Sequence, residues 1–419
     1  MRDPIRVFEH EMLRVGDRGF TEKHFSALVL YNERHGDRFF VVGHKRIKFA
    51  SYVGVIQVKG LAIEILPKAD RQDNGDRAMW RDVLVDMLKI CGYLNIESTS
   101  PAHLRLRRAS IFELYLEAFL DEVQRLVHQG LVKKYRSRED NLTVLKGRLR
   151  FQKHIAKNAV HRERFYTAHD TYDRNNPLNQ ILASAIDIVV SSSCSLHVKG
   201  TAKAMALHFE EARRRRWIGH DFDRLPFDRN TERYRKAIML ARLIILNYQP
   251  DVRMGQFDVL AILFNMNELF EEFVLHQLKK SGSEFGIQVK GQSSTQFWQA
   301  DGMRKTIRPD IVVTRNGADG DCVILDTKWK VPKHGRPADT DLKQMYAYNM
   351  QFGSSCSYLV YPQPGECQDV DGMFDPPKLQ KDLMHGCGMW YIDLIAKGRL
   401  RRDLGSDILK RIVWPSDDN

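Results

Sequence analysis

Short runs of β-branched and aromatic residues fill the first part of the chain. Residues 52–58 and 61–66 form two such apolar runs, which meet at Gly60. A glycine-containing turn between two runs of this kind predicts a β-hairpin, and Pro67 ends the second strand because proline cannot donate to a ladder. We therefore predict a β-rich N-terminal domain over residues 1–79.

Helical spacing replaces this pattern in the middle of the chain. Apolar residues recur every three to four positions in the runs 80–93, 111–127, 179–190 and 201–216. Ser110 followed by Glu113 has the form of a capping box. Residues 145–151 predict a turn that leads into an extended stretch. We therefore predict a mostly helical domain over residues 80–250.

In the last part of the chain, helical spacing of apolar residues alternates with short extended apolar runs. The runs predict a long helix at 257–280, extended stretches at 286–289, 310–314 and 322–329, a helix at 339–351 and a strand at 357–361. This order is typical of a small α/β domain with a mixed sheet. The predicted fold class is thus α+β and multidomain, with an α/β domain over residues 251–419.

Composition limits the class of protein. The 419 residues are 43% hydrophobic and 28% charged, which is ordinary for a globular chain of two or three domains. No apolar run approaches the roughly 20 residues of a membrane span, and the first residues lack the apolar core of a signal peptide, so we expect a cytoplasmic protein. None of the six cysteines forms a C-x-x-C pair, which argues against a zinc ribbon or a disulfide framework.

Positive charge is concentrated in the middle of the chain. The net charge is +12, and residues 81–250 carry 30 Lys and Arg against 19 Asp and Glu, whereas residues 251–419 carry 21 against 23. A basic segment of this kind favours a polyanionic partner, most simply nucleic acid. A solvated basic surface without a partner has the same composition.

Two acids and a lysine stand at the ends of predicted strands. Asp310 begins one apolar strand, and Asp326 and Lys328 end the next. Residues two apart on a strand share a face, and pairing of the two strands would bring Asp310 beside them. Two carboxylates suit a hard divalent cation, and a lysine can position water and offset charge on a phosphate. The pattern predicts metal-assisted phosphodiester hydrolysis; surface residues at strand ends are the alternative.

Polar residues on the flanking helices extend this set. An acidic cluster lies on the preceding helix, at Glu268, Glu271 and Glu272. On the following helix Gln344 and Tyr348 are four residues apart and therefore share one face. Helix packing is the alternative explanation for that pair.

These motifs resemble the PD-(D/E)xK nuclease superfamily and, more narrowly, the McrC family, the nuclease subunits of McrBC-type modification-dependent restriction systems. The resemblance spans nearly the whole chain. It rests on the catalytic motif and on the stretches 52–58, 63–68, 145–149, 179–182 and 266–274.

The resemblance implies a role for each site residue. Asp310 and Asp326 match the metal-binding acids, and Lys328 matches the catalytic lysine. Glu271 best matches the acid of the preceding helix, with Glu268 and Glu272 as alternatives. The implied helix motif, which supports the site or touches DNA, comprises Gln344 and Tyr348. The implied cofactor is Mg²⁺ or Mn²⁺.

The resemblance also implies a function and a partner. The expected activity is Mg²⁺-dependent cleavage of double-stranded DNA carrying 5-methylcytosine, together with stimulation of a McrB-like AAA+ GTPase. The sequence lacks G-x-x-x-x-G-K-[ST], so we expect GTP to be bound by the partner and not by this chain. Two other functions stay open: a non-catalytic module that regulates a GTPase, and a stand-alone RecB-like repair nuclease.

Overall fold

The computed structural model divides the chain into two compact units. It describes residues 4–58, 60–68, 76–94, 110–193, 195–249, 259–315, 322–332, 335–363, 367–376 and 383–414. The helical unit comprises residues 103–262 with 57–60 and the first two residues, and the composite unit comprises residues 3–56, 61–102 and 263–419. Most of the N-terminal part and the C-terminal part, which the sequence assigned to separate domains, thus lie in one compact unit.

Two small sheets and two helices form the N-terminal part of the composite unit. The elements are β1 (Ile5–Phe8), β2 (Met12–Arg14), a 3₁₀ turn (Asp17–Gly19), α1 (Glu22–Arg34), β3 (Phe40–Gly43), β4 (Arg46–Phe49), β5 (Tyr52–Val58), β6 (Leu61–Leu66) and α2 (Arg77–Ile90). β6 lies between β1 and β5, and β4 lies between β2 and β3. The predicted hairpin of β5 and β6 is present, whereas helix α1 was not predicted.

A five-stranded mixed sheet forms the core of the C-terminal part, as predicted. Its order is β12 (Ile287–Gly291), β15 (Ile311–Arg315), β16 (Cys322–Thr327), β17 (Cys356–Pro362) and β18 (Gly386–Ile392). β12, β15 and β16 are antiparallel, and β16, β17 and β18 are parallel. Helix α11 (Asp339–Phe352) packs on β16, β17 and β18, where Met345 and Tyr348 join a buried cluster with Ile324 and Leu359.

The remaining elements of this part surround the sheet. They are α10 (Met266–Gly282), the hairpin of β13 (Thr295–Ala300) and β14 (Met303–Ile307), the short pair β19 (Ile395–Ala396) and β20 (Arg399–Leu400), and α12 (Leu404–Arg411). α12 packs against α10, and α10 also contacts β12 and β16.

The long helix predicted at 257–280 is wrong in its first part. Residues Val259–Asn265 form strand β11, and α10 begins only at Met266, where the Asn265 side chain accepts a hydrogen bond from the backbone N–H of Asn267. The strand is apolar throughout and buried at six of its seven positions. A run that is apolar throughout has no periodicity by which a strand can be told from a helix. The helix begins where the Asn265 side chain caps its first turn.

Helices dominate the helical unit, as predicted. They are α4 (Ile111–His128), α6 (Pro177–Ser192), α7 (Leu196–Ala206), α8 (Gly219–Asp223) and α9 (Arg235–Leu246), with 3₁₀ turns at Leu207–Phe209 and Glu232–Tyr234 and a short strand β10 (Tyr248–Gln249). Ser110 caps α4 by accepting from the backbone N–H of Glu113, while the Glu113 carboxylate accepts from the Ser193 hydroxyl. The helix predicted at 201–216 ends earlier, at Ala206.

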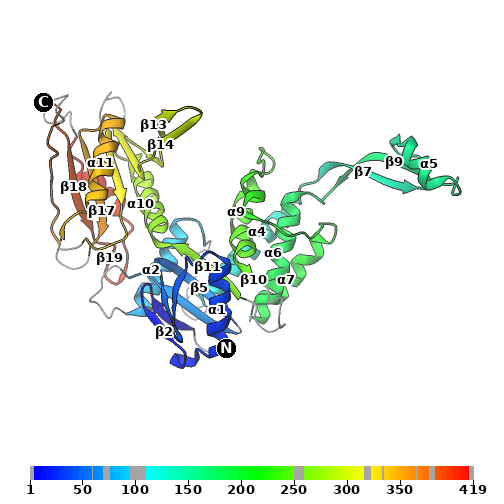
Figure 1. Ribbon diagram of the computed structural model, residues 1–419, viewed down its shortest axis with the longest axis horizontal. Helices are drawn as coiled ribbons and strands as arrows, with labels where there is room; N and C mark the ends of the chain where they lie inside the picture. The colour runs from blue at the N-terminus through cyan, green and yellow to red at the C-terminus, as the bar shows by residue number, and fades with distance from the viewer. Residues whose placement is uncertain are drawn as a thin grey trace. The chain divides into compact units, whose positions relative to one another are not determined.

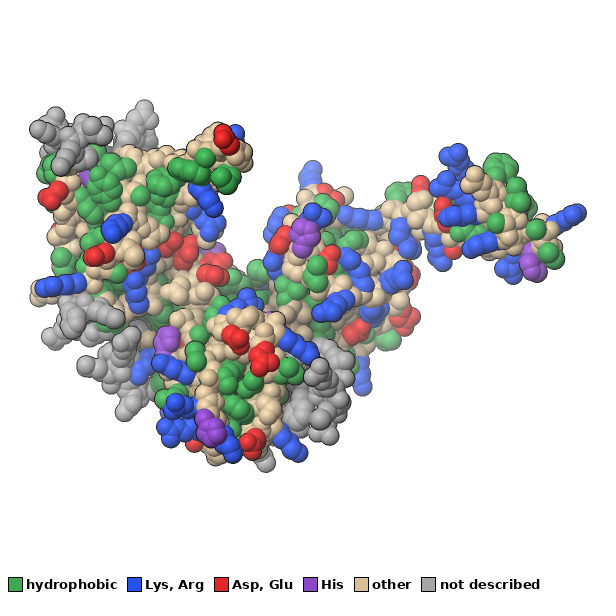
Figure 2. All heavy atoms as spheres, in the orientation of Figure 1, with side chains coloured by type: hydrophobic (Ala, Val, Ile, Leu, Met, Phe, Trp, Pro, Cys, Tyr) green, Lys and Arg blue, Asp and Glu red, His purple; other side chains and the backbone are tan. Residues whose placement is uncertain are grey.

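A β-arm that the sequence did not predict projects from these helices (Figure 1). It consists of β7 (Lys134–Leu142), β8 (Arg148–Leu149), α5 (Phe151–Asn158) and β9 (Phe165–Asp173), with β9 between β7 and β8. The turn predicted at 145–151 is present, but its extended stretch is only the two residues of β8. Figure 2 shows Lys and Arg side chains gathered over the arm and the neighbouring helices.

Candidate active site

A buried aspartate, Asp326, and a half-buried one, Asp310, meet where β15 and β16 lie side by side. β15 pairs with β16 in a register that places Ile311 opposite Leu325, so Asp310 and Asp326 lie on the adjoining step of the ladder. The carboxylate of Asp310 is fixed in place, because its Oδ2 accepts from the backbone N–H of Thr327 at 2.8 Å and from the Thr327 hydroxyl at 3.1 Å. The structure therefore brings the two predicted metal ligands together.

Burial and mutual repulsion perturb both carboxyl groups. Asp326 is fully buried, and burial together with the charge of Asp310 raises its pKa to about 7 although Lys328 opposes the shift. Burial also raises the pKa of Asp310, against the hydrogen bonds from Thr327. Asp326 Oδ1 accepts no hydrogen bond from any residue that the structure describes. A buried, unbonded carboxylate oxygen beside a second carboxylate is costly for folding alone and is typical of a site with a function.

Lys328 lies beside Asp326, one residue past the end of β16. β16 ends at Thr327, so Lys328 follows the strand. Its backbone N–H still donates to Val360 of β17 at 2.9 Å, which keeps the chain in line with the sheet. Its Nζ lies 2.6 Å from Asp326 Oδ2. Burial opposes the charge of Lys328, yet the neighbouring carboxylates, Asp326 foremost, outweigh it and raise the lysine's pKa.

The glutamine and tyrosine of α11 connect this lysine to the loop before Asp310. Lys328 Nζ donates to Gln344 Oε1 at 3.2 Å, and Gln344 Nε2 donates to the Tyr348 hydroxyl at 2.7 Å. The Tyr348 hydroxyl in turn donates to the carbonyl of Arg308 at 2.9 Å. Gln344 and Tyr348 therefore hold the lysine and the aspartate strand in one hydrogen-bonded chain.

Of the three glutamates on α10, Glu271 is the one that faces Asp310. Burial and the charge of Asp310 raise the pKa of Glu271, whose Oε1 accepts from Gln292 Nε2 at 3.0 Å. Glu272 instead accepts a hydrogen bond from the Tyr93 hydroxyl at 2.9 Å. Glu268 lies in the first turn of the helix and is exposed. The geometry thus favours Glu271 among the three alternatives.

Three polar residues near the site were not singled out from the sequence. Thr327 holds Asp310, and Gln292 donates its backbone N–H to the Asp310 carbonyl at 2.8 Å. Asp341 is buried in the first turn of α11, where it accepts from Lys330 Nζ at 2.6 Å and lies 3.9 Å from Lys328 Nζ. Asp341 stands three residues before Gln344, a spacing that places both on one helical face and would have marked it.

The donor set suits a hard divalent cation. Mg²⁺ is usually held by one or two carboxylates while it keeps several waters. Asp310 and Asp326 supply two carboxylates, one of them with the unbonded oxygen described above. Within the described residues no three His, Cys, Asp or Glu side chains form a metal-binding cluster by themselves. The pair therefore fits a cation that retains much of its hydration shell, with Glu271 near enough to act on Asp310 electrostatically.

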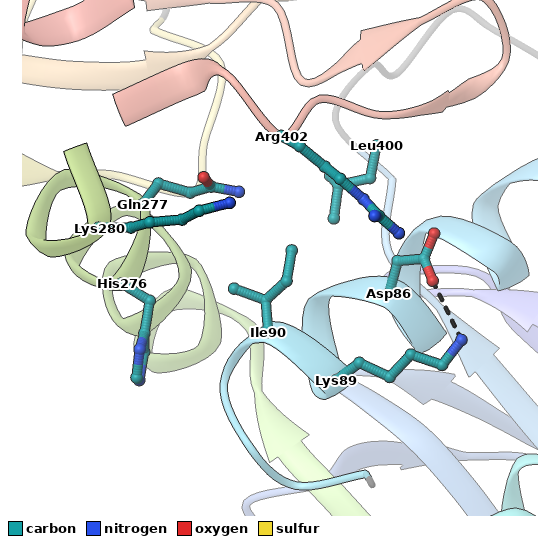
Figure 3. Close-up of a pocket in the computed structure, with 8 residues that line it drawn as sticks. All are labelled: Asp86, Lys89, Ile90, His276, Gln277, Lys280, Leu400 and Arg402. Atoms are coloured by element: carbon teal, nitrogen blue, oxygen red, sulfur yellow. Dashed lines mark hydrogen bonds and ion pairs between the residues drawn. The ribbon is translucent and has the colours of Figure 1, made fainter. Parts of the chain in front are cut away.

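A separate cavity of about 330 Å³ lies away from these acids, among α2, α10 and β20 (Figure 3). Its lining combines apolar and basic side chains: Asp86, Lys89, Ile90, His276, Gln277, Lys280, Leu400 and Arg402. Lys89 Nζ pairs with Asp86 Oδ1 at 3.3 Å. None of the predicted site residues lines this cavity, so it is distinct from the candidate active site.

The architecture is thus that of an α/β protein with acids and a lysine gathered on a mixed sheet. A family model described as "McrBC 5-methylcytosine restriction system component" matches residues 47–362. The chain belongs to this family, which confirms the resemblance inferred from the sequence. No curated protein matches the chain.

Two solved structures are similar to this chain. One is a refined half-complex from a tetradecameric assembly of Thermococcus gammatolerans McrB AAA+ hexamers with bound McrC; the similarity has a TM-score of 0.63 at 19% identity and covers 98% of this chain and 100% of that one. The other is a cryo-EM structure of the Thermococcus gammatolerans McrBC complex, with a TM-score of 0.49 at 19% identity over 67% of this chain and 88% of that one. The first likeness establishes a shared fold over nearly the whole chain.

Proposed function

We propose that this chain is the Mg²⁺-dependent DNA endonuclease subunit of a GTP-driven restriction complex that acts on DNA carrying 5-methylcytosine. The observation that carries the proposal is the group formed by Asp310, Asp326 and Lys328 on the mixed sheet, in a chain of a restriction-system family. This group corresponds to the PD-(D/E)xK motif, and Mn²⁺ is an alternative metal.

Each residue of the group has a distinct task in phosphodiester hydrolysis. Asp310 and Asp326 would hold the cation, which when bound supplies Lewis-acid stabilisation and a water of lowered pKa. Lys328 is held protonated by its neighbours, so it can orient the attacking water and offset charge on the phosphate. Gln344 fixes the position of the Lys328 ammonium, and Tyr348 ties Gln344 to the loop that carries Asp310. Glu271 adds a third acid beside the pair.

A McrB-like AAA+ GTPase is the partner we propose. The structure to which this chain is similar over nearly its full length comes from a complex of McrB AAA+ hexamers with bound McrC. The helical unit is the candidate docking part for that partner or for DNA, since the positive charge of the chain is concentrated there. We further propose that this docking stimulates GTP hydrolysis by the partner, and that GTP is bound by the partner alone.

A cleavage assay tests this function directly. Plasmids with and without 5-methylcytosine are incubated with the chain, Mg²⁺ and GTP, in the presence and absence of the GTPase partner, and Asp310→Ala serves as the matched control. Cleavage of the methylated plasmid only in the complete mixture supports the proposal. Stimulated GTP hydrolysis without any cleavage would favour the alternative of a non-catalytic GTPase regulator. Cleavage that does not need the partner would favour a stand-alone nuclease.

A further inference from the structure

The β13–β14 hairpin connects two neighbouring strands of the sheet, and its base lies beside Asp310. β12 and β15 are antiparallel neighbours with Gly291 opposite Ile311, and the hairpin fills the segment between them. Gln292, directly after β12, closes the base: its backbone N–H donates to the Asp310 carbonyl at 2.8 Å and its side chain donates to Glu271 at 3.0 Å. Figure 1 shows the two strands projecting beyond the sheet. These contacts hold the base of the hairpin beside the acids.

Large apolar side chains on this hairpin face solvent. Phe297 is 56% exposed, Trp298 47% and Met303 58%. All six tryptophans of the chain lie in the described part, and the other five are at most 8% exposed. The pairing shifts register between Gln296 and Trp298, which marks a β-bulge at Phe297. Bulges next to active sites re-aim a side chain, so both aromatic rings are presented outward by the local backbone and not by chance exposure of one residue.

Positive charge accompanies these rings. Trp298 lies opposite Lys305, and Gln299 lies opposite Arg304, so a cation shares the face of the exposed tryptophan. Lys305 and Arg304 are both exposed and have no hydrogen-bond or ion-pair partner within the described residues. In Figure 2 hydrophobic side chains line the hairpin with Lys and Arg side chains beside them. Aromatic rings together with unpaired cations match bases and phosphates respectively.

We propose that the β13–β14 hairpin binds the duplex being cleaved, with Phe297 and Trp298 wedged against base steps in a groove and Arg304 and Lys305 against the backbone. This inference rests on the proposed nuclease function and names a contact beyond the catalytic group. Lys305, opposite Trp298, is five residues from Asp310, which is at most about 17 Å of extended chain. At 3.4 Å per base-pair step, the aromatic contact falls within about five base pairs of the scissile phosphate.

The hairpin's attachment favours DNA over a protein partner as the occupant. Gln351 of α11 donates its side chain to the Gln296 carbonyl at 3.0 Å, so the hairpin is tied to the helix that carries Gln344 and Tyr348. The hairpin therefore adjoins both the strand that follows Asp310 and the helix whose Gln344 contacts Lys328. Surfaces that are continuous with a nuclease site and carry net positive charge suit the duplex itself.

Tryptophan fluorescence of the full-length chain measures the contact between Trp298 and DNA without requiring cleavage. A duplex oligonucleotide is titrated into the chain in buffer without divalent metal while tryptophan emission is recorded. Because the other tryptophans are buried, we expect quenching that comes from Trp298 and that disappears in Trp298→Phe. Absence of quenching at DNA concentrations that saturate binding, measured by anisotropy of a labelled duplex, overturns the proposal.

Cleavage by the complex with the GTPase partner gives the second readout. We expect Phe297→Ala with Trp298→Ala to weaken DNA binding about tenfold and to raise KM with little change in kcat. Phe285→Ala removes another exposed aromatic ring, on the turn after α10, and is the matched control. Parental KM in the double variant, or a defect confined to GTPase stimulation or to oligomeric state, overturns the proposal in favour of a protein interface. A parent chain that binds DNA with Trp298 quenching but never cleaves would instead contradict the proposed nuclease function alone.

Discussion

Asp326 is the residue at which stability and the proposed activity oppose each other most directly. Its carboxylate is fully buried beside Asp310, and one of its oxygens accepts no hydrogen bond within the described residues. Folding gains nothing from this arrangement, because a buried charge is compensated only when it is paired and hydrogen-bonded. Lys328 supplies part of that compensation, and a bound cation would supply the rest.

Neutralising this carboxyl group is therefore expected to end cleavage while sparing the fold. Asp326→Asn keeps the size of the side chain but removes a ligand charge, so cleavage of methylated plasmid by the complex should be abolished. Its thermal midpoint should stay within a few degrees of the parent, and GTPase stimulation should persist. Normal cleavage by Asp326→Asn would remove Asp326 from the site.

Gln344 and Tyr348 should act as a coupled pair. Gln344→Ala frees the Lys328 ammonium, and Tyr348→Phe removes the hydroxyl that Gln344 donates to. We expect each variant to lower kcat about tenfold and the double variant to be little worse, because members of one hydrogen-bonded chain are not additive. A double-mutant cycle on cleavage rates checks this; fully multiplicative losses would mean that the two residues act separately.

Glu9 gives the fold a dependence on pH. This residue follows β1 and is buried, and its Oε1 accepts from Trp329 Nε1 at 2.6 Å and from the Lys68 backbone N–H at 2.9 Å. Burial raises the pKa of Glu9 to about 7 in spite of these hydrogen bonds. Its folded pKa exceeds its unfolded value, so stability is fully present below about pH 4.5 and is lost as the pH rises through 7, by roughly 3 kcal/mol in all.

Glu9→Gln should remove this dependence, since glutamine keeps the acceptor oxygen but cannot ionise. Denaturant unfolding at pH 5 and pH 8 is the measurement, and the parent should lose about 2.5 kcal/mol more than the variant between the two. The exposed His10 has its Nε2 3.8 Å from Glu9 Oε2, so His10→Gln in both backgrounds controls for its titration. Equal losses in parent and variant would contradict the assignment.

At the scale of elements, the helices and strands with a regular apolar pattern could be predicted from the sequence. The elements without such a pattern could not. α2, α4, α6 and α11 were found because their apolar residues recur with a period close to 3.6. The strands β7 and β9 were missed because polar residues occupy both of their faces, so no apolar alternation exists. The β13–β14 hairpin was missed for the same reason, although its Asp301–Gly302 turn is a strong hairpin signal.

The residues of the candidate site could likewise be predicted where they adjoin an apolar strand. Asp310, Asp326 and Lys328 could be proposed because each adjoins an apolar strand, and their proximity follows from the pairing of β15 with β16. Gln292 could not be found, since its role depends on the long excursion between β12 and β15 that only the fold reveals. Glu271 was preferred over its neighbours by its match to the family motif alone, and the rotation of α10 supports that preference.

The packing of α12 on α10 depends on a glycine. A Cβ at Gly405 would lie 2.1 Å from the Gln277 carbonyl oxygen, so Gly405→Ala forces the two helices apart. We expect it to lower the free energy of unfolding by about 3 kcal/mol. Gly200 lies within α7 and a Cβ there meets nothing within 4 Å, so Gly200→Ala should be neutral or stabilising by up to about 1 kcal/mol. Thermal unfolding of both variants checks the contrast; equal midpoints would contradict it.

At the scale of the molecule, the composite unit joins two segments that are far apart in the sequence. Trp329 donates to Glu9 and also packs edge-on against Phe270 of α10. Tyr93, after α2, donates to Glu272 of α10. The segment that carries the proposed catalytic group therefore relies on residues from the first hundred for its packing, and the intervening helical unit is an insertion between its two halves.

The two halves of the composite unit should consequently be stable only together. A fragment of residues 259–419 contains every proposed catalytic residue but lacks Glu9 and Tyr93, which leaves Trp329 and Glu272 without these partners and exposes apolar surface. We expect this fragment alone to aggregate or to unfold at least 10 °C below the full chain, since the lost contacts amount to several kcal/mol. Co-expression with an affinity-tagged fragment of residues 1–102 should rescue it and retain it on the affinity resin.

The matched control is the same tagged fragment carrying Glu9→Ala, which removes the acceptor of Trp329 and should retain less of the partner fragment. A fragment of residues 259–419 that is monomeric by itself, with the thermal midpoint of the full chain, would show that the C-terminal part is an independent domain.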